Sequence, residues 1–365
     1  MNYKTSIQSF NPDYSVIPGD SLLEIMESKG LTQADLAERT GRPKKTINEI
    51  AKGKAAITFE TAIQLERVLG VPASFWISLE SNYRSNLARI EEREKLSLQT
   101  AWLSKFPVAE MIKRKWIQNR TDKVAMLEEI LSFFGVANPN AWEEIWHHRD
   151  GIADFRRQTT EVDNTGVVAT WLRRGELIGR ERDCKQFDAS AFKQALNYIR
   201  LRTSHPDINE TVHQMTEICA NAGVAVVLVQ EFPRLGVYGA TRWLSQDKAL
   251  IQLSLHYKRA DQFWFSFFHE AGHILLHGKR DMFVEKKGSV DKNEEEANNF
   301  AKNHLIPQKE YNDFVDSGNF SSDSIVSFAN KLSIHPCIVV GRLQHEKLIK
   351  YNERTDLLLK LTWPD

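Results

Sequence analysis

Residues 262–277 read QFWFSFFHEAGHILLH, and this stretch decides the fold of the C-terminal half of the chain. Its almost unbroken apolar character over about four helical turns predicts a buried helix. His269 and His273 are four residues apart, so both imidazoles lie on one face of that helix and can aim at one metal ion. Glu270 lies beside them and can accept a proton from water without being a ligand. The motif HEAGH therefore predicts a zinc site with Glu270 as its catalytic residue.

A catalytic zinc site needs a third protein ligand, which must come from another part of the chain. His277 is a poor candidate because eight residues along a helix place it about 12 Å from His269. The acidic segment EEEANNFA (294–301) is a better source. We favour Glu294, because Asn298 then shares its helix face and can support a ligand histidine from behind. Spacing alone does not separate Glu294 from its neighbours Glu295 and Glu296.

The pattern along the whole chain predicts a mostly helical α+β protein. Residues 1–83 are expected to form a five-helix domain similar to lambda repressor, 84–190 a helical linker region, and 191–365 a zincin-like domain with a small sheet and a C-terminal helical element. AGVAVVLVQ (222–230) and ALIQLSL (249–255) are rich in β-branched residues and predict strands. ALIQLSL is either an edge strand that holds an extended peptide beside the metal site or an ordinary core strand.

Composition limits the location and the partners of the protein. Lys plus Arg and Asp plus Glu both number 48, so the net charge is zero and any DNA contact must come from a local patch. The three cysteines are widely spaced and form no CxxC pair, which argues against a disulfide framework or a cysteine zinc site. No apolar run is long enough to span a bilayer, and the N-terminus does not resemble a secretory signal. We expect a cytoplasmic protein without a membrane partner.

Residues 32–52, TQADLAERTGRPKKTINEIAK, predict a helix-turn-helix. Ala37 allows close approach of the two helices, and Gly41 tolerates the positive φ of the turn. Ile47 and Ile50 dock the second helix onto the rest of the bundle. The segment around Pro336 has a similar outline, but its apolar spacing fits less well, and we expect it to pack against the core.

The exposed side of the second helix offers side chains that can reach base edges and phosphates in a major groove. Residues 31–54 carry six basic and three acidic side chains, a modest excess that suits a homodimer on two half-sites. The DNA-binding candidates are Gln33, Arg42, Lys44, Lys45, Thr46 and Asn48.

Two resemblances add to these inferences. TQADLAERTG…TINEIAKGKAAIT…AIQLERVLGVPASFW resembles Cro/CI-type (XRE) regulators, and HigA-type antitoxins in particular, over residues 17–83. ALIQLSLHYKRADQFWFSFFHEAGHILLH, together with EEEANNFAKNHLIP, resembles the ImmA/IrrE (M78-type) metallopeptidases. The first resemblance implies operator binding by a dimer. The second implies zinc on the two histidines and a downstream acidic residue, and cleavage of repressor proteins.

Two functions are consistent with this sequence. The chain is either a transcriptional regulator whose zinc endopeptidase domain cuts a regulatory protein, or a HigA-like antitoxin and autorepressor whose zincin domain binds a toxin or ligand without catalysis. The intact HEAGH favours the enzyme, because a purely structural site has no need of Glu270. The HigA-like N-terminus favours the antitoxin, and both hypotheses include binding to double-stranded operator DNA.

Overall fold

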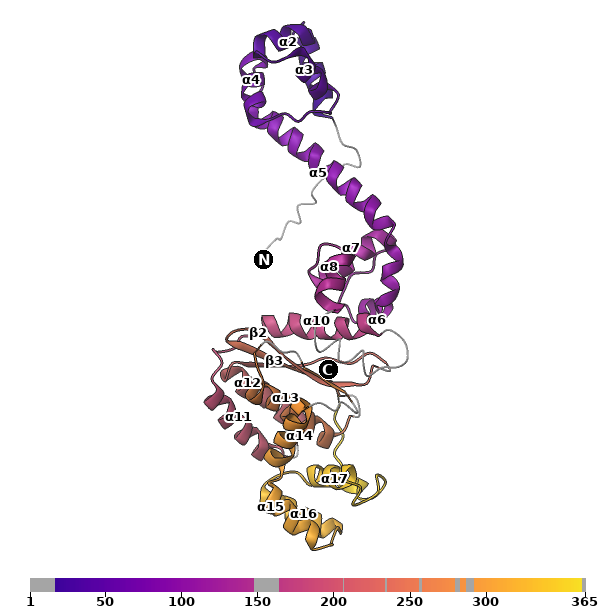
Figure 1. Cartoon of the computed structure of the whole chain (residues 1–365), viewed down its shortest axis with the longest axis vertical. Coiled ribbons are helices and arrows are strands. Elements are labelled where there is room, and N and C mark those ends of the chain that lie inside the picture. Colours follow the sequence, from indigo (N-terminus) through magenta and orange to yellow (C-terminus); the bar gives the residue numbers. More distant parts are fainter. Residues whose placement is uncertain are drawn as a thin grey trace, which may run out of the picture. The chain divides into compact units, whose positions relative to one another are not determined.

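The computed structural model describes residues 17–147, 164–205, 207–233, 235–255, 258–279, 283–286 and 292–362. The chain divides into two compact units, one ending at Thr100 and one beginning at Ala101. Both units are mainly helical, and the sheet belongs to the second (Figure 1). The α+β class predicted from the sequence is confirmed.

The first unit is a bundle of five helices. Their bounds are α1 Pro18–Ser28, α2 Gln33–Thr40, α3 Lys44–Ala51, α4 Phe59–Leu69 and α5 Ala73–Ser97. The core that they share includes Leu22, Leu36, Ile47, Leu65 and Trp76, all fully buried. The boundary expected at residue 83 falls inside α5, a single continuous helix of 25 residues, and the structural unit ends at Thr100.

Local sequence signals fix the turn between α2 and α3. Thr32 and Asp35 form a reciprocal capping box at the start of α2, which satisfies two backbone N–H groups that the helix leaves open. Gly41 ends α2 in the left-handed conformation at φ 67°, as its place in the sequence predicted. A close contact that was not predicted from the sequence lies at Gly19. A Cβ there would lie 2.1 Å from the carbonyl oxygen of Ala51, so α1 meets the end of α3 backbone to backbone.

The second unit is built around a four-stranded sheet in the order β1-β3-β2-β4. Its strands are β1 Val224–Leu228, β2 Val237–Ser245, β3 Lys248–Leu253 and β4 Phe283–Lys286. β1 runs parallel to β3, while β2 is antiparallel to both β3 and β4. The segment ALIQLSL thus forms an inner strand, so its interpretation as an edge strand is wrong and the core-strand alternative holds.

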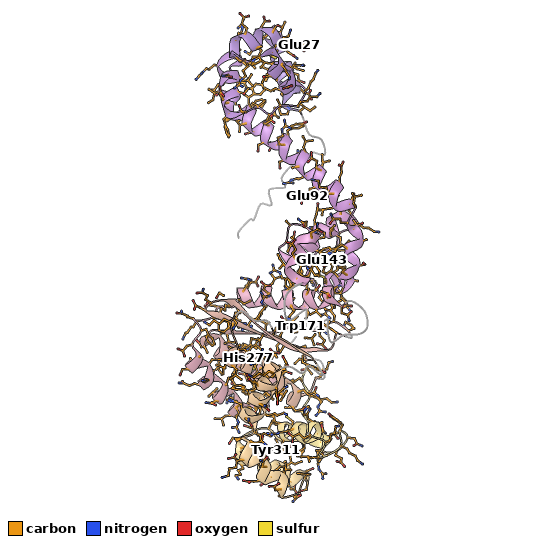
Figure 2. The ribbon with its side chains drawn as sticks, viewed as in Figure 1. Glu27, Glu92, Glu143, Trp171, His277 and Tyr311 are labelled. Carbon is orange, nitrogen blue, oxygen red and sulfur yellow. The ribbon has the colours of Figure 1, made fainter. Side chains whose placement is uncertain are left out.

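Helices cover both faces of this sheet (Figure 1). On one face lies α10 (Thr165–Glu181), where the indole N–H of Trp171 donates to the carbonyl oxygen of Val229 (Figure 2). The other face packs against α12 (Ile208–Asn221) and α13 (Ala260–Leu276). Alternate residues of β1 enter two separate cores, Val224 and Val226 on the α13 side and Ala225 and Val227 on the α10 side.

The remaining helices complete these two cores. Beside α10 lie η1 Thr100–Lys105, α6 Val108–Lys113, α7 Lys123–Phe134, α8 Pro139–Trp142 and the π-turn η2 Glu143–His147. On the α13 side lie α11 Ala189–Arg202, α14 Lys292–Leu305, α15 Gln308–Asp316, α16 Ser322–Leu332, α17 Pro336–His345 and η3 Thr355–Leu357. Among the described residues, no single helix has the length and apolar character needed to cross a membrane; α16 and α17 pass that test only as a pair bent by 115°.

Candidate metal centre and helix-turn-helix

Three side chains predicted as metal ligands converge in the second unit. His269 and His273 project from α13, and Glu294 comes from the first turn of α14, which packs alongside α13. The Nε2 atoms of the two imidazoles lie 3.0 Å apart. Glu294 places one carboxylate oxygen 3.2 Å from His269 Nε2 and the other 3.3 Å from His273 Nε2.

These separations fit a tetrahedral metal ion. Ligand atoms at about 2.0–2.1 Å from zinc lie about 3.4 Å from one another in tetrahedral geometry, close to the observed distances. Two nitrogens and one carboxylate are also a ligand set of catalytic zinc sites, which keep the fourth position open. All three residues are buried. The donor set present here therefore fits a zinc ion.

The protonation states of the ligands favour metal binding. Burial lowers the pKa of His273 to about 4, so its imidazole is neutral near pH 7. Burial alone would raise the pKa of Glu294, but hydrogen bonds with His269 and His273 outweigh it and lower the pKa to about 2. Neutral imidazole and ionised carboxylate are the forms that coordinate a metal.

Asn298 lies one turn after Glu294, and its amide oxygen is 3.1 Å from Nδ1 of His269. A proton on Nδ1 donates to that oxygen and leaves the lone pair of Nε2 directed at the ligand cluster. Asn298 thus lies beside the nitrogen of His269 that faces away from the other two candidate ligands, and its supporting role stays a prediction. Glu295 and Glu296, the rivals of Glu294, lie outside the ligand cluster found among the described residues.

Glu270 is fully buried between α13 and strand β2. The hydroxyl of Thr241 donates to the Glu270 carboxylate at 2.5 Å and lies 3.1 Å from its backbone carbonyl oxygen. At Gly239, a Cβ would lie 2.5 Å from Oε1 of Glu270, so a larger residue there would displace the carboxylate from this position. Neither contact was predicted from the sequence. Their signal was the two-residue period of the strand, which turns Gly239 and Thr241 to the same face.

The helix-turn-helix candidates differ in exposure. Lys44 and Lys45 are exposed on α3, while Thr46, Asn48 and Gln33 are half-buried. Arg42 lies in the turn, and its side chain is bound to helix α4. Its Nε donates to Gln64 at 2.5 Å, and its guanidinium lies 3.4 Å from Glu60. Arg42 therefore joins the turn to α4, a role that the sequence did not reveal.

Comparisons with known protein families agree with this division of the chain. Residues 22–76 match the family model of the helix-turn-helix, and residues 227–323 match that of the IrrE N-terminal-like domain, a peptidase family of the M78 type. The chain thus joins an XRE-type helix-turn-helix domain to an IrrE-like, peptidase-type domain.

Two similar solved structures each cover less than a quarter of this chain. An addiction module antidote protein of the HigA family from Coxiella burnetii is 25% identical; the match covers 23% of this chain and 91% of that one, with a TM-score of 0.21. Antitoxin HigA of Pseudomonas aeruginosa, solved with the higBA promoter, is 26% identical over 22% of this chain and 90% of that one, with a TM-score of 0.22. A search of curated proteins finds no match.

Proposed function

We propose that this protein is a DNA-binding transcriptional regulator whose second unit is a zinc-dependent endopeptidase that cleaves a regulatory protein. The observation that carries the proposal is the convergence of His269, His273 and Glu294, with the buried Glu270 next to them on the same helix. A ligand set without a neighbouring base would serve a structural metal equally well. The additional carboxylate supports catalysis.

Each residue of the site has a distinct role in this proposal. His269, His273 and Glu294 would hold zinc, and Asn298 fixes the tautomer of His269. Zinc bound there would polarise a peptide carbonyl and make a water molecule more acidic. Glu270 accepts a proton from the attacking water and passes it to the departing amine. The hydroxyl of Thr241 holds the Glu270 carboxylate in one orientation for this transfer.

The first unit would bring this activity to an operator. In the proposal, α3 enters the major groove of double-stranded DNA and presents Lys44, Lys45, Thr46 and Asn48, while Gln33 at the start of α2 approaches the backbone. Arg42 acts indirectly, by holding the turn against α4. Two copies binding two half-sites would compensate for the small positive charge of one unit.

The decisive test separates metal binding from catalysis. The E270Q variant should retain about one zinc per chain, because Glu270 lies outside the ligand cluster, and it should lose cleavage. His273→Ala should lose zinc and cleavage together. Zinc content can be measured by mass spectrometry, and cleavage by comparing new protein N-termini in cells that express the wild type or E270Q.

The result could instead contradict the enzyme. If E270Q cells show the same N-termini and the same regulation of the target promoter, the second unit does not act as a peptidase. The second unit would then be better described as a binding domain, as in an antitoxin that binds a toxin or a ligand without catalysis.

A further inference from the structure

His277 lies one helical turn beyond His273 and is nearly buried, with 5% of its side chain exposed. It is not part of the ligand cluster. Its Nδ1 lies 2.9 Å from Nδ1 of His273, and its Nε2 lies 3.3 Å from a carboxylate oxygen of Glu296. Figure 2 labels His277 within the second unit.

The contact falls on the edge of the His273 ring that faces away from the ligand cluster. His273 turns Nε2 toward Glu294 and Nδ1 toward His277. For Nε2 to offer a lone pair to a metal, the proton of the neutral ring must sit on Nδ1. The Nδ1–H of His273 then donates to Nδ1 of His277. The proton of His277 therefore sits on Nε2, and this N–H donates to the Glu296 carboxylate. A single direction of hydrogen bonding thus fixes the tautomer of both imidazole rings.

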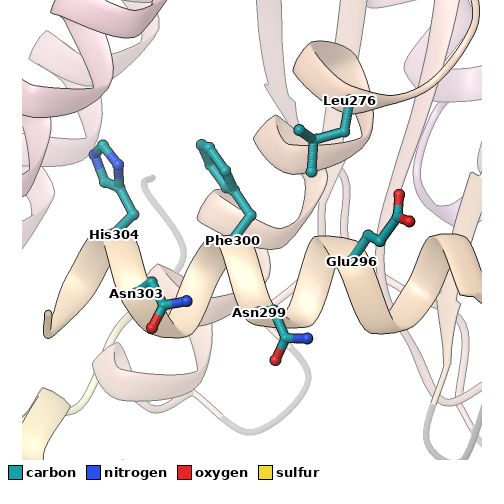
Figure 3. A pocket seen from close by; sticks show the side chains of 6 residues that line it. All are labelled: Leu276, Glu296, Asn299, Phe300, Asn303 and His304. Carbon is teal, nitrogen blue, oxygen red and sulfur yellow. The ribbon is translucent and has the colours of Figure 1, made fainter. Parts of the chain in front are cut away.

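The backbone keeps this arrangement in place. α13 ends at Leu276, and His277 takes an extended conformation (φ −113°, ψ 168°) while its N–H still bonds to the carbonyl oxygen of His273. Glu296 reaches it from α14, the helix that also supplies Glu294. Figure 3 shows Glu296 projecting from α14 toward the end of α13, where Leu276 lies. Lys292, one turn earlier on α14, lies 3.6 Å from the other oxygen of Glu296.

We propose that His277, anchored by Glu296, is the positioning residue of the second zinc-binding histidine. The inference rests on the metal centre of the proposed function. His269 is oriented by a neutral amide, Asn298, whereas His273 is oriented by an imidazole that is itself held by a carboxylate. Hydrogen-bond partners of this kind fix ring orientation and increase the basicity of the ligand.

Zinc affinity of the full-length protein, measured by competition with a chromogenic chelator, tests this assignment. His277→Phe keeps a ring but removes the acceptor, and it should weaken zinc binding about 10–100-fold. His277→Asn supplies an acceptor oxygen and should recover part of the zinc affinity that His277→Phe loses. A side chain that only fills space would give no such recovery. Glu296→Ala should weaken binding less than His277→Phe, since Glu296 acts through His277.

Controls separate this inference from the metal centre itself. Glu295→Gln removes the neighbouring exposed charge on α14 and should leave affinity unchanged, while His269→Ala should abolish binding. Cobalt(II) absorption should report an altered ligand field in His277→Phe and a normal one in Glu295→Gln. If circular dichroism shows that His277→Phe does not fold, the zinc affinity of Glu296→Ala tests the positioning role of His277 by itself.

If His277→Phe and Glu296→Ala both bind zinc as tightly as the wild type, His277 does not position His273. The proposed metal centre would be unaffected by that result. Absence of zinc binding by the wild type would overturn the metal centre and this inference together. Zinc binding that depends on His277 without any protein cleavage would contradict only the proposed peptidase.

Discussion

Thr241 on strand β2 and Glu270 on helix α13 meet inside the second unit, where the hydroxyl donates to the buried carboxylate. A carboxylate buried away from water is costly unless hydrogen bonds compensate for its lost hydration. Thr241 supplies such a bond at 2.5 Å, and Gly239 lets the strand approach closely enough to form it. In the proposed enzyme the same contact would also orient the general base, so one hydroxyl would serve both stability and catalysis.

Thr241→Val should show both effects at once. It preserves the shape of the side chain but removes the donor, and we expect a loss of about 1–3 kcal/mol in the free energy of unfolding. Cleavage should slow while zinc content stays near one per chain. Thr241→Ser, which keeps the hydroxyl, is the matched control. Equal stability of the Val and Ser variants in urea titrations would show that the hydrogen bond contributes little.

At the scale of elements, two helix pairs have a similar outline and different surroundings. α3 follows a turn at Gly41 and exposes Lys44 and Lys45. α17 follows a turn at Ser333 (φ 54°), but its side chains Ile338, Val339, Val340 and Leu343 are buried in the core that contains α13. A groove-reading helix must leave one face open. The expectation that the C-terminal pair packs against the core is therefore confirmed.

The exposed face of α3 leads to a prediction about DNA. Lys45→Ala should weaken binding to all operator sequences to a similar extent. It should also reduce the slope of log affinity against log salt concentration by about one, as expected for the loss of a phosphate contact. Asn48→Ala should instead reduce discrimination between sequences, by about 1–3 kcal/mol at one base pair. Lys95→Ala, an exposed lysine on α5, is the control. Unchanged gel-shift affinities for Lys45→Ala and Asn48→Ala would exclude α3 as the reading helix.

At the scale of the whole molecule, the chain consists of two compact units with separate cores. The metal ligands all belong to the second unit, and the helix-turn-helix belongs to the first. A ligand that binds only the folded form of one unit stabilises that unit and not the other.

Calorimetry of the full chain should therefore show two unfolding transitions. Zinc at about 1,000 times its dissociation constant should stabilise the second unit by about 4 kcal/mol and leave the first transition in place. Adding a chelator should reverse the shift. A single transition that moves as a whole with zinc would mean that the two units unfold together.

Features that depend on local spacing could be predicted from the amino-acid sequence. The four-residue spacing of His269 and His273 places two imidazoles on one helix face, and Gly41 between two short amphipathic helices specifies the turn. Such periodicities follow from backbone geometry and need no knowledge of distant parts of the chain. Spacing also placed Asn298 on the same helix face as Glu294, but it did not separate Glu294 from Glu295 or Glu296.

Which distant groups meet became clear from the packing of the elements in three dimensions. The packing of α14 along α13 separates Glu294 from Glu295 and Glu296, and it brings Glu296 to His277. The order of strands places β3 inside the sheet and turns Thr241 toward Glu270. Contacts of this kind depend on how elements far apart in the sequence pack together. The spacing of residues within one element shows which face is buried, but not which distant element covers it.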